Sequence, residues 1–140
     1  MGYQTADDYL AREDAKFTKA ELDCGCCGLM KFHPGFLEHL HGLRLAFGRG
    51  MTLNSACRCK RHNAAVGGNA RSLHVGDEAQ HPGQLGTLAV DVSIPDGEYR
   101  GALFALAWRL GWSVGWNAKK GFLHLDRRDW CGMKQNSFDY

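Results

Sequence analysis

The fold is decided by one stretch of sequence, Thr87-Leu88-Ala89-Val90-Asp91-Val92-Ser93-Ile94. Every second residue in it is a large aliphatic one, and the positions between them hold Ala89, Asp91 and Ser93. This alternation predicts a strand with one packed face, and it places Asp91 on the opposite face beside Ala89. A carboxylate in the middle of such a strand is costly unless it is paired or binds a cation. The stretch therefore predicts both a central strand and a candidate site on it.

Further strand signals lie mostly later in the chain. Trp112–Trp116 and Phe122–Asp126 are strand-like, and Asn117–Gly121 between them is typical of a hairpin loop. Met51–Asn54 is a shorter strand candidate. Because neighbouring strands joined by a short loop run in opposite directions, we expect a small, mainly antiparallel sheet.

Helical spacing of apolar residues marks the helices that flank this sheet. Phe36, Leu40, Leu43 and Phe47 form one stripe, Glu98–Leu110 carries a second, and Lys60–Val66 fits a short helix. Helices early and in the middle, with strands clustered late, indicate an α+β fold. We expect a single domain over residues 1–140, with residues 1–23 as an N-terminal arm packed on it.

Composition excludes several classes of protein. The chain has 140 residues, and 17 Lys plus Arg against 15 Asp plus Glu give a formal charge of +2. This balance does not suit a nucleic-acid binder. No apolar run approaches the ~20 residues of a membrane helix, so we expect no membrane insertion. The first ten residues do not have the pattern of a secretory signal, so we expect a protein made in the cytoplasm, and we expect a monomer.

Cysteines are unusually frequent near two positions. Cys24, Cys26 and Cys27 lie together, as do Cys57 and Cys59. They could suggest a structural zinc site, but the pairs Cys24-x-Cys26 and Cys57-x-Cys59 lack the usual two-residue gap. In a reducing cytosol six cysteines are not an obvious disulfide framework. We therefore favour small buried thiols or a local disulfide.

Three metal-binding side chains stand out: His74, Asp91 and His124. His124 is a polar residue inside the apolar segment Phe122–Asp126, as Asp91 is in its own strand. Two histidines and one carboxylate are a typical catalytic zinc set that leaves a position for water. Judged by spacing alone, two hydrogen-bonded structural histidines and a capping aspartate are the alternative.

Four segments together resemble the zinc D-Ala-D-Ala carboxypeptidase family: Ser55–Gly68, Ser72-Leu73-His74, Leu88–Val92 and Phe122–Asp126. These cell-wall peptidases include phage endolysins and resemble the peptidase-like domain of hedgehog proteins. The resemblance runs from about Cys24 to Asp126. Its most specific parts are the Ser-x-His step, the Ala-x-Asp strand and the run His-Asn-Ala-Ala-Val-Gly-Gly that ends at Gly68.

The resemblance assigns roles to individual residues. It implies one zinc ion held by His74, Asp91 and His124, with Arg58 binding the carboxylate of the substrate and Ser72 near the substrate. The planar fork of arginine suits a carboxylate, which it grips with two hydrogen bonds. The alternatives are that Arg58 is a surface residue paired with an acid, and that the Ser72 hydroxyl bonds its own backbone.

The sequence departs from the family pattern in the spacing of its first two ligands. Relatives hold the first His and the Asp seven positions apart, whereas His74 and Asp91 are 17 apart, which makes residues 77–86 an inserted loop. The loop contains His81, a rival to His74 as ligand, and we expect it to form one wall of the substrate cleft. We favour His74 because Ser72 precedes it in the manner of the family.

A second departure concerns the proton acceptor. Many relatives carry an acidic residue three positions before the last His, where this chain has Gly121. Asp126 is then the candidate general base, because it shares the face of His124 on a strand. The alternatives are that Asp126 supports His124 or pairs with Arg127 or Arg128. Asp77 and Glu78 are the next candidates for the general base.

The sequence thus leads to one main functional hypothesis and two others. The first is a zinc peptidase that hydrolyses peptidoglycan stem peptides or cross-bridges. The resemblance implies a phage lysis enzyme or a carboxypeptidase-like hydrolase that reaches the cell wall through a separate phage-encoded pore. The second is a catalytically inactive, zinc-stabilised cell-wall or protein binding module. A zinc-ribbon nucleic-acid binder is disfavoured by the charge and by the cysteine spacing.

Overall fold

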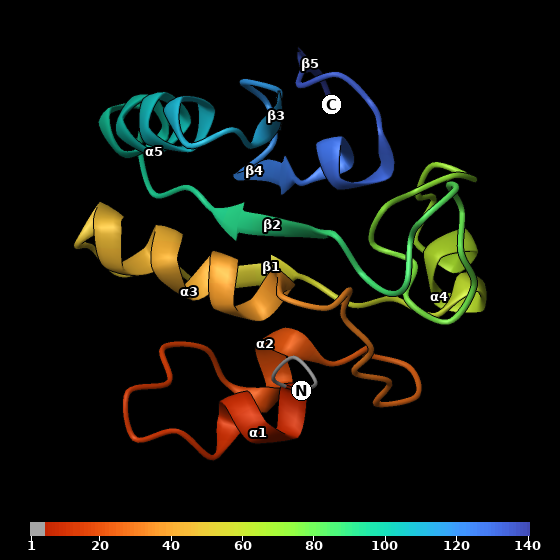
Figure 1. The fold of residues 1–140 in the computed structure, drawn as a ribbon. Helices are drawn as coiled ribbons and strands as arrows, with labels where there is room; N and C mark the ends of the chain where they lie inside the picture. Colours follow the sequence, from red (N-terminus) through yellow and green to blue (C-terminus); the bar gives the residue numbers. More distant parts are fainter. Residues whose placement is uncertain (1–4) are drawn as a thin grey trace.

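A five-stranded sheet forms the centre of the computed structural model, which describes residues 5–140 (Figure 1). Its strands are β1 (Leu53–Ser55), β2 (Ala89–Ser93), β3 (Ser113–Trp116), β4 (Phe122–Asp126) and β5 (Ser137–Asp139). They lie in the order β1-β2-β4-β3-β5. All neighbours are antiparallel except β3 and β5, which are parallel. The predicted α+β fold with a mainly antiparallel sheet is confirmed.

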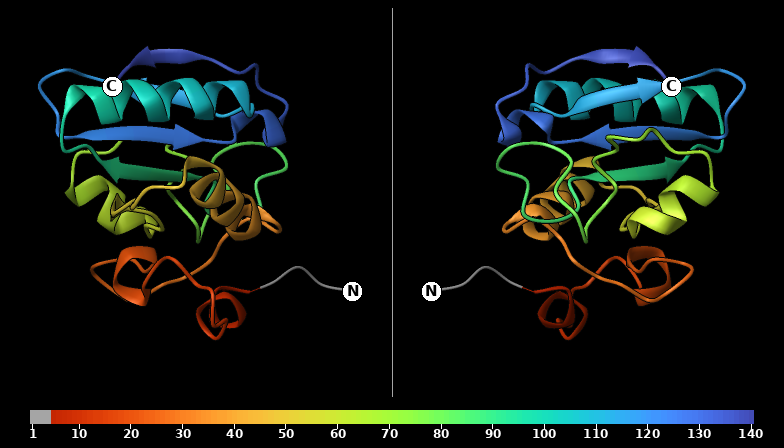
Figure 2. Two further views of the ribbon diagram at one scale, coloured as in Figure 1. Left: turned by 90° about the vertical axis from the view of Figure 1, so that its left-hand side faces the viewer. Right: turned by 90° about the vertical axis from the view of Figure 1, so that its right-hand side faces the viewer.

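Two long helices cover one face of this sheet. These are α3 (Phe36–Phe47) and α5 (Gly97–Arg109), which lie together on one side of the strands in both views of Figure 2. The short helix α4 (Lys60–Ala65) lies on the other side. α3 ends at Gly48, whose φ of 69° is the left-handed conformation that commonly closes a helix. No helix in residues 5–140 is long and apolar enough to cross a membrane.

The alternation in β2 and β4 separates a packed face from a polar one. Residues of these strands that point to α3 and α5 are aliphatic and fully buried: Val90, Val92, Leu123 and Leu125. The register places Asp91 opposite His124 and Ala89 opposite Asp126. Because residues opposite each other in adjacent strands share a face, the three polar side chains stand together on the side away from the core.

The N-terminal segment joins the same core. It forms α1 (Ala6–Leu10) and α2 (Lys19–Leu22), each beginning with a threonine whose side chain accepts from the third residue of its helix. Tyr9, Phe17 and Leu22 are buried in the core cluster. Residues 1–4 of the predicted arm lie outside the described residues.

The C-terminal part of the chain contains structure that the sequence did not predict. A 3₁₀ turn, η1 (Arg128–Cys131), is followed by β5, which pairs with β3 along Val114, Gly115 and Trp116. A strand of three residues is too short to show an alternating pattern. The first strand also begins later than the predicted Met51, at Leu53.

The packed face gives a direct test of the fold. Leu125 is fully buried between the sheet and the helices, so Leu125→Ala should lower the free energy of unfolding by about 2–5 kcal/mol through lost burial and the cavity it leaves. Leu45→Ala is the matched control because Leu45 is 54 % exposed, and it should change stability by less than about 0.5 kcal/mol. Chemical denaturation measures both, and equal losses would contradict this packing.

Candidate metal centre

His74, Asp91 and His124 meet on the polar face of the sheet. One ligand atom from each lies within 4.8 Å of the others, and all three residues are buried. Asp91 Oδ1 is 3.2 Å from His74 Nε2 and 3.0 Å from His124 Nδ1. Asp91 and His124 come from the paired strands β2 and β4, and His74 comes from the loop that precedes β2.

The outer hydrogen bonds of the two histidines decide which nitrogen atoms carry protons. His74 Nδ1 is 2.7 Å from the Ala56 carbonyl oxygen, which can only accept, so this nitrogen donates. His124 Nε2 is 2.8 Å from Asp126 Oδ2 and donates to it. In the neutral rings the inner nitrogens, His74 Nε2 and His124 Nδ1, then each carry a lone pair that points toward the Asp91 carboxylate. Three electron-rich atoms converging without a proton are the donor set of a cation site, and they fit zinc.

The electrostatics agree with a positive charge at this point. Burial alone would raise the pKa of Asp91, but the facing imidazoles outweigh it and hold the pKa of this carboxyl well below its usual range. Burial lowers the pKa of His74. Burial acts in the same direction on His124, but there the facing carboxylates of Asp126 and Asp91 prevail and raise its pKa. The two carboxylates thus favour a cation between them, which a bound metal supplies.

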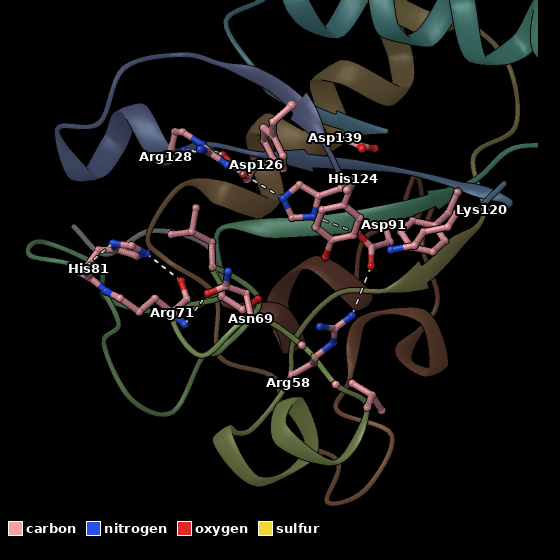
Figure 3. Close-up of a pocket in the computed structure, with 18 of the residues that line it drawn as sticks. Arg58, Asn69, Arg71, His81, Asp91, Lys120, His124, Asp126, Arg128 and Asp139 are labelled. Atoms are coloured by element: carbon pink, nitrogen blue, oxygen red, sulfur yellow. Dashed lines mark hydrogen bonds and ion pairs between the residues drawn. The ribbon is translucent and has the colours of Figure 1, made fainter. Parts of the chain in front are cut away.

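Arg58 lies against the other oxygen of Asp91 (Figure 3). Its Nη2 is 3.3 Å from Asp91 Oδ2, its Nη1 donates to Asn63 Oδ1 at 3.1 Å and its Nε donates to Ser55 Oγ at 3.0 Å. It is therefore a buried residue with an acidic partner and not a surface residue. Three of the five N–H groups of a guanidinium are used in this way. The Tyr140 side chain, which also lines the pocket, is a further neighbour of the Arg58 guanidinium.

Asn63 and Gly68 are parts of the site that sequence reasoning missed. Asn63 is buried, and its Nδ2 donates to the carbonyl of Asn69 at 2.8 Å while its Oδ1 holds Arg58. A Cβ at Gly68 would lie 2.1 Å from Asn63 Oδ1. Gly68 is therefore needed for the loop to close over Asn63. The motif around His62 quoted for the resemblance was the signal, because it contains both residues.

The residues predicted around His74 differ in their placement. Ser72 lines the pocket, and its Oγ accepts from the backbone N–H of His74 at 3.1 Å, which was the alternative for this residue. His81 also lines the pocket, as expected for a wall formed by residues 77–86, but it lies outside the cluster and its Nε2 is 2.8 Å from the Arg71 carbonyl oxygen. Among the two histidines, the structure brings His74 to Asp91.

Other acidic candidates lie away from the cluster. Asp77 accepts from the backbone N–H of Lys60 at 3.0 Å, and Glu78 pairs with Lys60 Nζ at 2.9 Å. Neither lines the pocket. They link the inserted loop to the start of α4.

Asp126 is fully buried and each of its oxygens is engaged. Oδ2 accepts from His124 Nε2 and from Arg128 Nη2 at 2.7 Å, and Oδ1 accepts from Arg128 Nε and backbone N–H, both at 3.0 Å. Burial opposes ionisation, but these bonds to His124 and Arg128 prevail and lower the pKa of Asp126 to about 2. This is the geometry of a residue that orients His124, and a carboxylate with so low a pKa is a weak proton acceptor.

A pocket of about 640 Å³ opens above the cluster (Figure 3). The C-terminal segment forms part of its lining through Phe138 and Tyr140. The Tyr140 ring stacks on His124 with centroids 4.4 Å apart. Gly115 makes room for these rings, since a Cβ there would lie 2.6 Å from Phe138. Tyr140 was missed from the sequence because β5 was missed.

A buried cluster of two histidines and one aspartate, at a pocket beside a buried arginine, is typical of metal-dependent hydrolases. A family profile described as Peptidase M15 matches residues 9–126, which is most of the chain. The chain therefore belongs to the peptidase M15 family of zinc-dependent metallopeptidases. Searches of curated proteins and of solved structures gave no match. The resemblance stated from the sequence is confirmed.

Replacing any one of the three clustered residues tests the metal centre. His74→Ala, Asp91→Ala and His124→Ala should each lose one equivalent of zinc relative to the unchanged protein, because zinc sites need all their protein ligands. His81→Ala is the matched control from the same pocket and should retain the zinc. Metal analysis of the purified proteins measures the difference. Zinc lost from His81→Ala and retained by His74→Ala would reverse the choice of histidine.

Proposed function

We propose that this protein is a zinc peptidase that hydrolyses peptide bonds in bacterial peptidoglycan, in the stem peptide or the cross-bridge. The observation that carries the proposal is the convergence of His74 Nε2, Asp91 Oδ1 and His124 Nδ1 beside Arg58, at a pocket that Arg58, Asp91 and His124 line. A volume of about 640 Å³ suits a short peptide segment.

A zinc ion bound by these three residues supplies an activated water and polarises the scissile carbonyl. The other residues position the reactants. Arg58 would bind the free carboxylate of a peptide through N–H groups that Ser55, Asn63 and Asp91 do not use, next to Tyr140, and Asn63 holds its guanidinium in place. The Ser72 hydroxyl, which accepts from His74, still has its own proton to donate to a substrate carbonyl.

The charge of the pocket favours an anionic peptide. Its lining includes four basic side chains, Arg58, Arg71, Lys120 and Arg128, against three acidic ones, Asp91, Asp126 and Asp139. Arg58 and Arg128 pair with Asp91 and Asp126, so the basic excess comes from Arg71 and Lys120. Arg71 donates to the carbonyl of Gln80, and Lys120 Nζ lies over the rings of Phe122 and Tyr140. Stem peptides carry free carboxylates that such a lining would attract. A phage lysis setting, with release through a separate pore, rests on the resemblance.

The alternative is a zinc-stabilised binding module without turnover. The observation that favours it is the position of Asp126, whose two oxygens accept four hydrogen bonds, together with Gly121 where many relatives have an acid. A module of this kind would bind the peptide through Arg58 and release it unchanged.

Incubation with purified peptidoglycan separates the two functions. We expect clearing of a peptidoglycan zymogram by the unchanged protein and none by His124→Ala. Mass spectrometry of the released fragments then identifies the bond that is cut. Binding to peptidoglycan without any new fragment would support the module and contradict the peptidase.

Arg58→Lys tests substrate binding because it keeps the charge and loses the fork. Hydrolysis should fall by ~10–100-fold, which corresponds to about 1.5–3 kcal/mol for a charge-assisted hydrogen bond. Zinc content should stay the same. Arg49→Lys is the matched control, since Arg49 makes a similar two-bond pair with Glu98 outside the pocket. Unchanged kinetics of Arg58→Lys would exclude Arg58 from substrate binding.

Asp126→Asn decides between a base and a positioning residue. We propose that Asp126 positions His124, so the variant should lose ~10–100-fold in zinc affinity. The low-pH limb of the rate should persist, because a carboxyl with a pKa of about 2 stays ionised under assay conditions. A general base predicts full zinc and a rate ~10²–10⁴-fold lower. Zinc occupancy and rate measured on one sample distinguish them.

A further inference from the structure

A second group of metal-binding atoms lies outside the pocket. The sulfur atoms of Cys24, Cys26, Cys27 and Cys59 all lie within 4.8 Å of one another. Cys26 Sγ is 3.6 Å from Cys24 Sγ and 3.4 Å from Cys59 Sγ. All four cysteines are free thiols in the structure. Four thiols in such proximity need a chemical reason, since nothing in ordinary packing gathers them.

The spacing of the sulfur atoms matches tetrahedral coordination. Zinc binds thiolate sulfur at about 2.3 Å in a tetrahedral site, which separates neighbouring sulfur atoms by roughly 3.8 Å. The observed separations of 3.4 and 3.6 Å, with all others below 4.8 Å, leave a centre of this size. A single disulfide would use two of the thiols and leave two beside it without a role.

The local sequence has the form of a metal-binding turn. Cys24 and Cys27 are separated by two residues, and Gly28 follows with a φ of 76°. Its N–H donates to the Cys24 carbonyl at 2.8 Å and closes the turn. The two-residue gap that the sequence interpretation found missing is therefore present between Cys24 and Cys27. Cys57 does not join, because its Sγ bonds the Lys31 carbonyl at 3.7 Å.

Donors and positive charge surround the sulfur atoms. The backbone N–H of Cys59 lies 3.4 Å from Cys24 Sγ, and that of His62 lies 3.3 Å from Cys59 Sγ. The Arg61 side chain lies near Cys26 and favours its thiolate form. Cys59 also precedes the first turn of α4. Because four thiolates around a divalent ion carry a net charge of −2, N–H donors and a guanidinium stabilise the metal-bound form.

We propose that Cys24, Cys26, Cys27 and Cys59 bind a second zinc ion in a closed, structural site. The ion would link the turn at Cys24–Gly28 to Cys59, which directly follows Arg58. It thereby fixes the backbone that presents the guanidinium to the pocket. The two metal sites share no residue, so zinc binding at the four cysteines can be tested apart from the proposed activity.

Zinc stoichiometry of the full chain, purified under reducing conditions, tests the site. The unchanged protein should contain two zinc ions, Cys27→Ser one, and Cys27→Ser combined with His124→Ala none. Cys57→Ser is the matched control because Cys57 is a buried cysteine outside the cluster, and it should keep two. A His124→Ala protein without zinc, or as much zinc in Cys27→Ser as in the unchanged protein, would overturn the proposal.

A second measurement covers the case in which Cys27→Ser does not fold. The His124→Ala protein, refilled with Co²⁺ in place of zinc, should show the strong near-ultraviolet charge-transfer absorption of thiolate bound to cobalt. A mercurial thiol reagent should release that ion. Absence of the absorption, or a mass under non-reducing conditions that shows a disulfide among the four cysteines, would overturn the site whatever the activity of the protein.

Discussion

The carboxylate of Asp91 is the interaction on which the site depends. It is buried in the middle of the sheet, where an ionised group is strongly disfavoured unless its charge is compensated. Compensation comes from both sides, through the imidazoles at one oxygen and Arg58 at the other. Removing any of these partners weakens the compensation of a buried charge, so the metal binding and the substrate binding that we propose are linked through Asp91. Arg58 takes part in both, because it pairs with Asp91 and we propose that it binds the substrate carboxylate.

Each group around Asp91 is in turn fixed by a second contact. The Ala56 carbonyl sets the orientation of His74, Asp126 sets that of His124, and Asn63 sets that of Arg58. Such outer contacts choose the nitrogen that faces the metal and raise its basicity. The result is a site whose geometry is prepared before a ligand arrives, which reduces the reorganisation needed for catalysis.

The sequence could predict those strands that show an alternating pattern of apolar and polar residues. The alternation around Asp91 predicted β2, and the same period in Phe122–Asp126 predicted β4. The pairing that brings Asp91 opposite His124 was not predicted, because it joins strands that are far apart in the chain. The placement of Asn63 could not be predicted, because its function depends on a loop closing at Gly68. Likewise Tyr140 is brought to His124 by a parallel pairing of β5 with β3, between strands separated in the chain by β4 and η1.

The segment from Ser55 to Asn63 joins the two candidate metal sites. Ser55 and Asn63 hold the guanidinium of Arg58, the carbonyl of Ala56 orients His74, and Cys59 belongs to the thiol cluster. The backbone of Arg58 itself is bridged to His74 and Gly76, through bonds of 2.9 Å each. A displacement of Cys59 would therefore shift both the residue that we propose binds the substrate carboxylate and the contact that orients a metal ligand. Small displacements of this kind reduce catalysis strongly. A closed metal site that includes Cys59 would therefore stabilise the pocket through the segment Ser55–Asn63, which contacts both candidate metal sites.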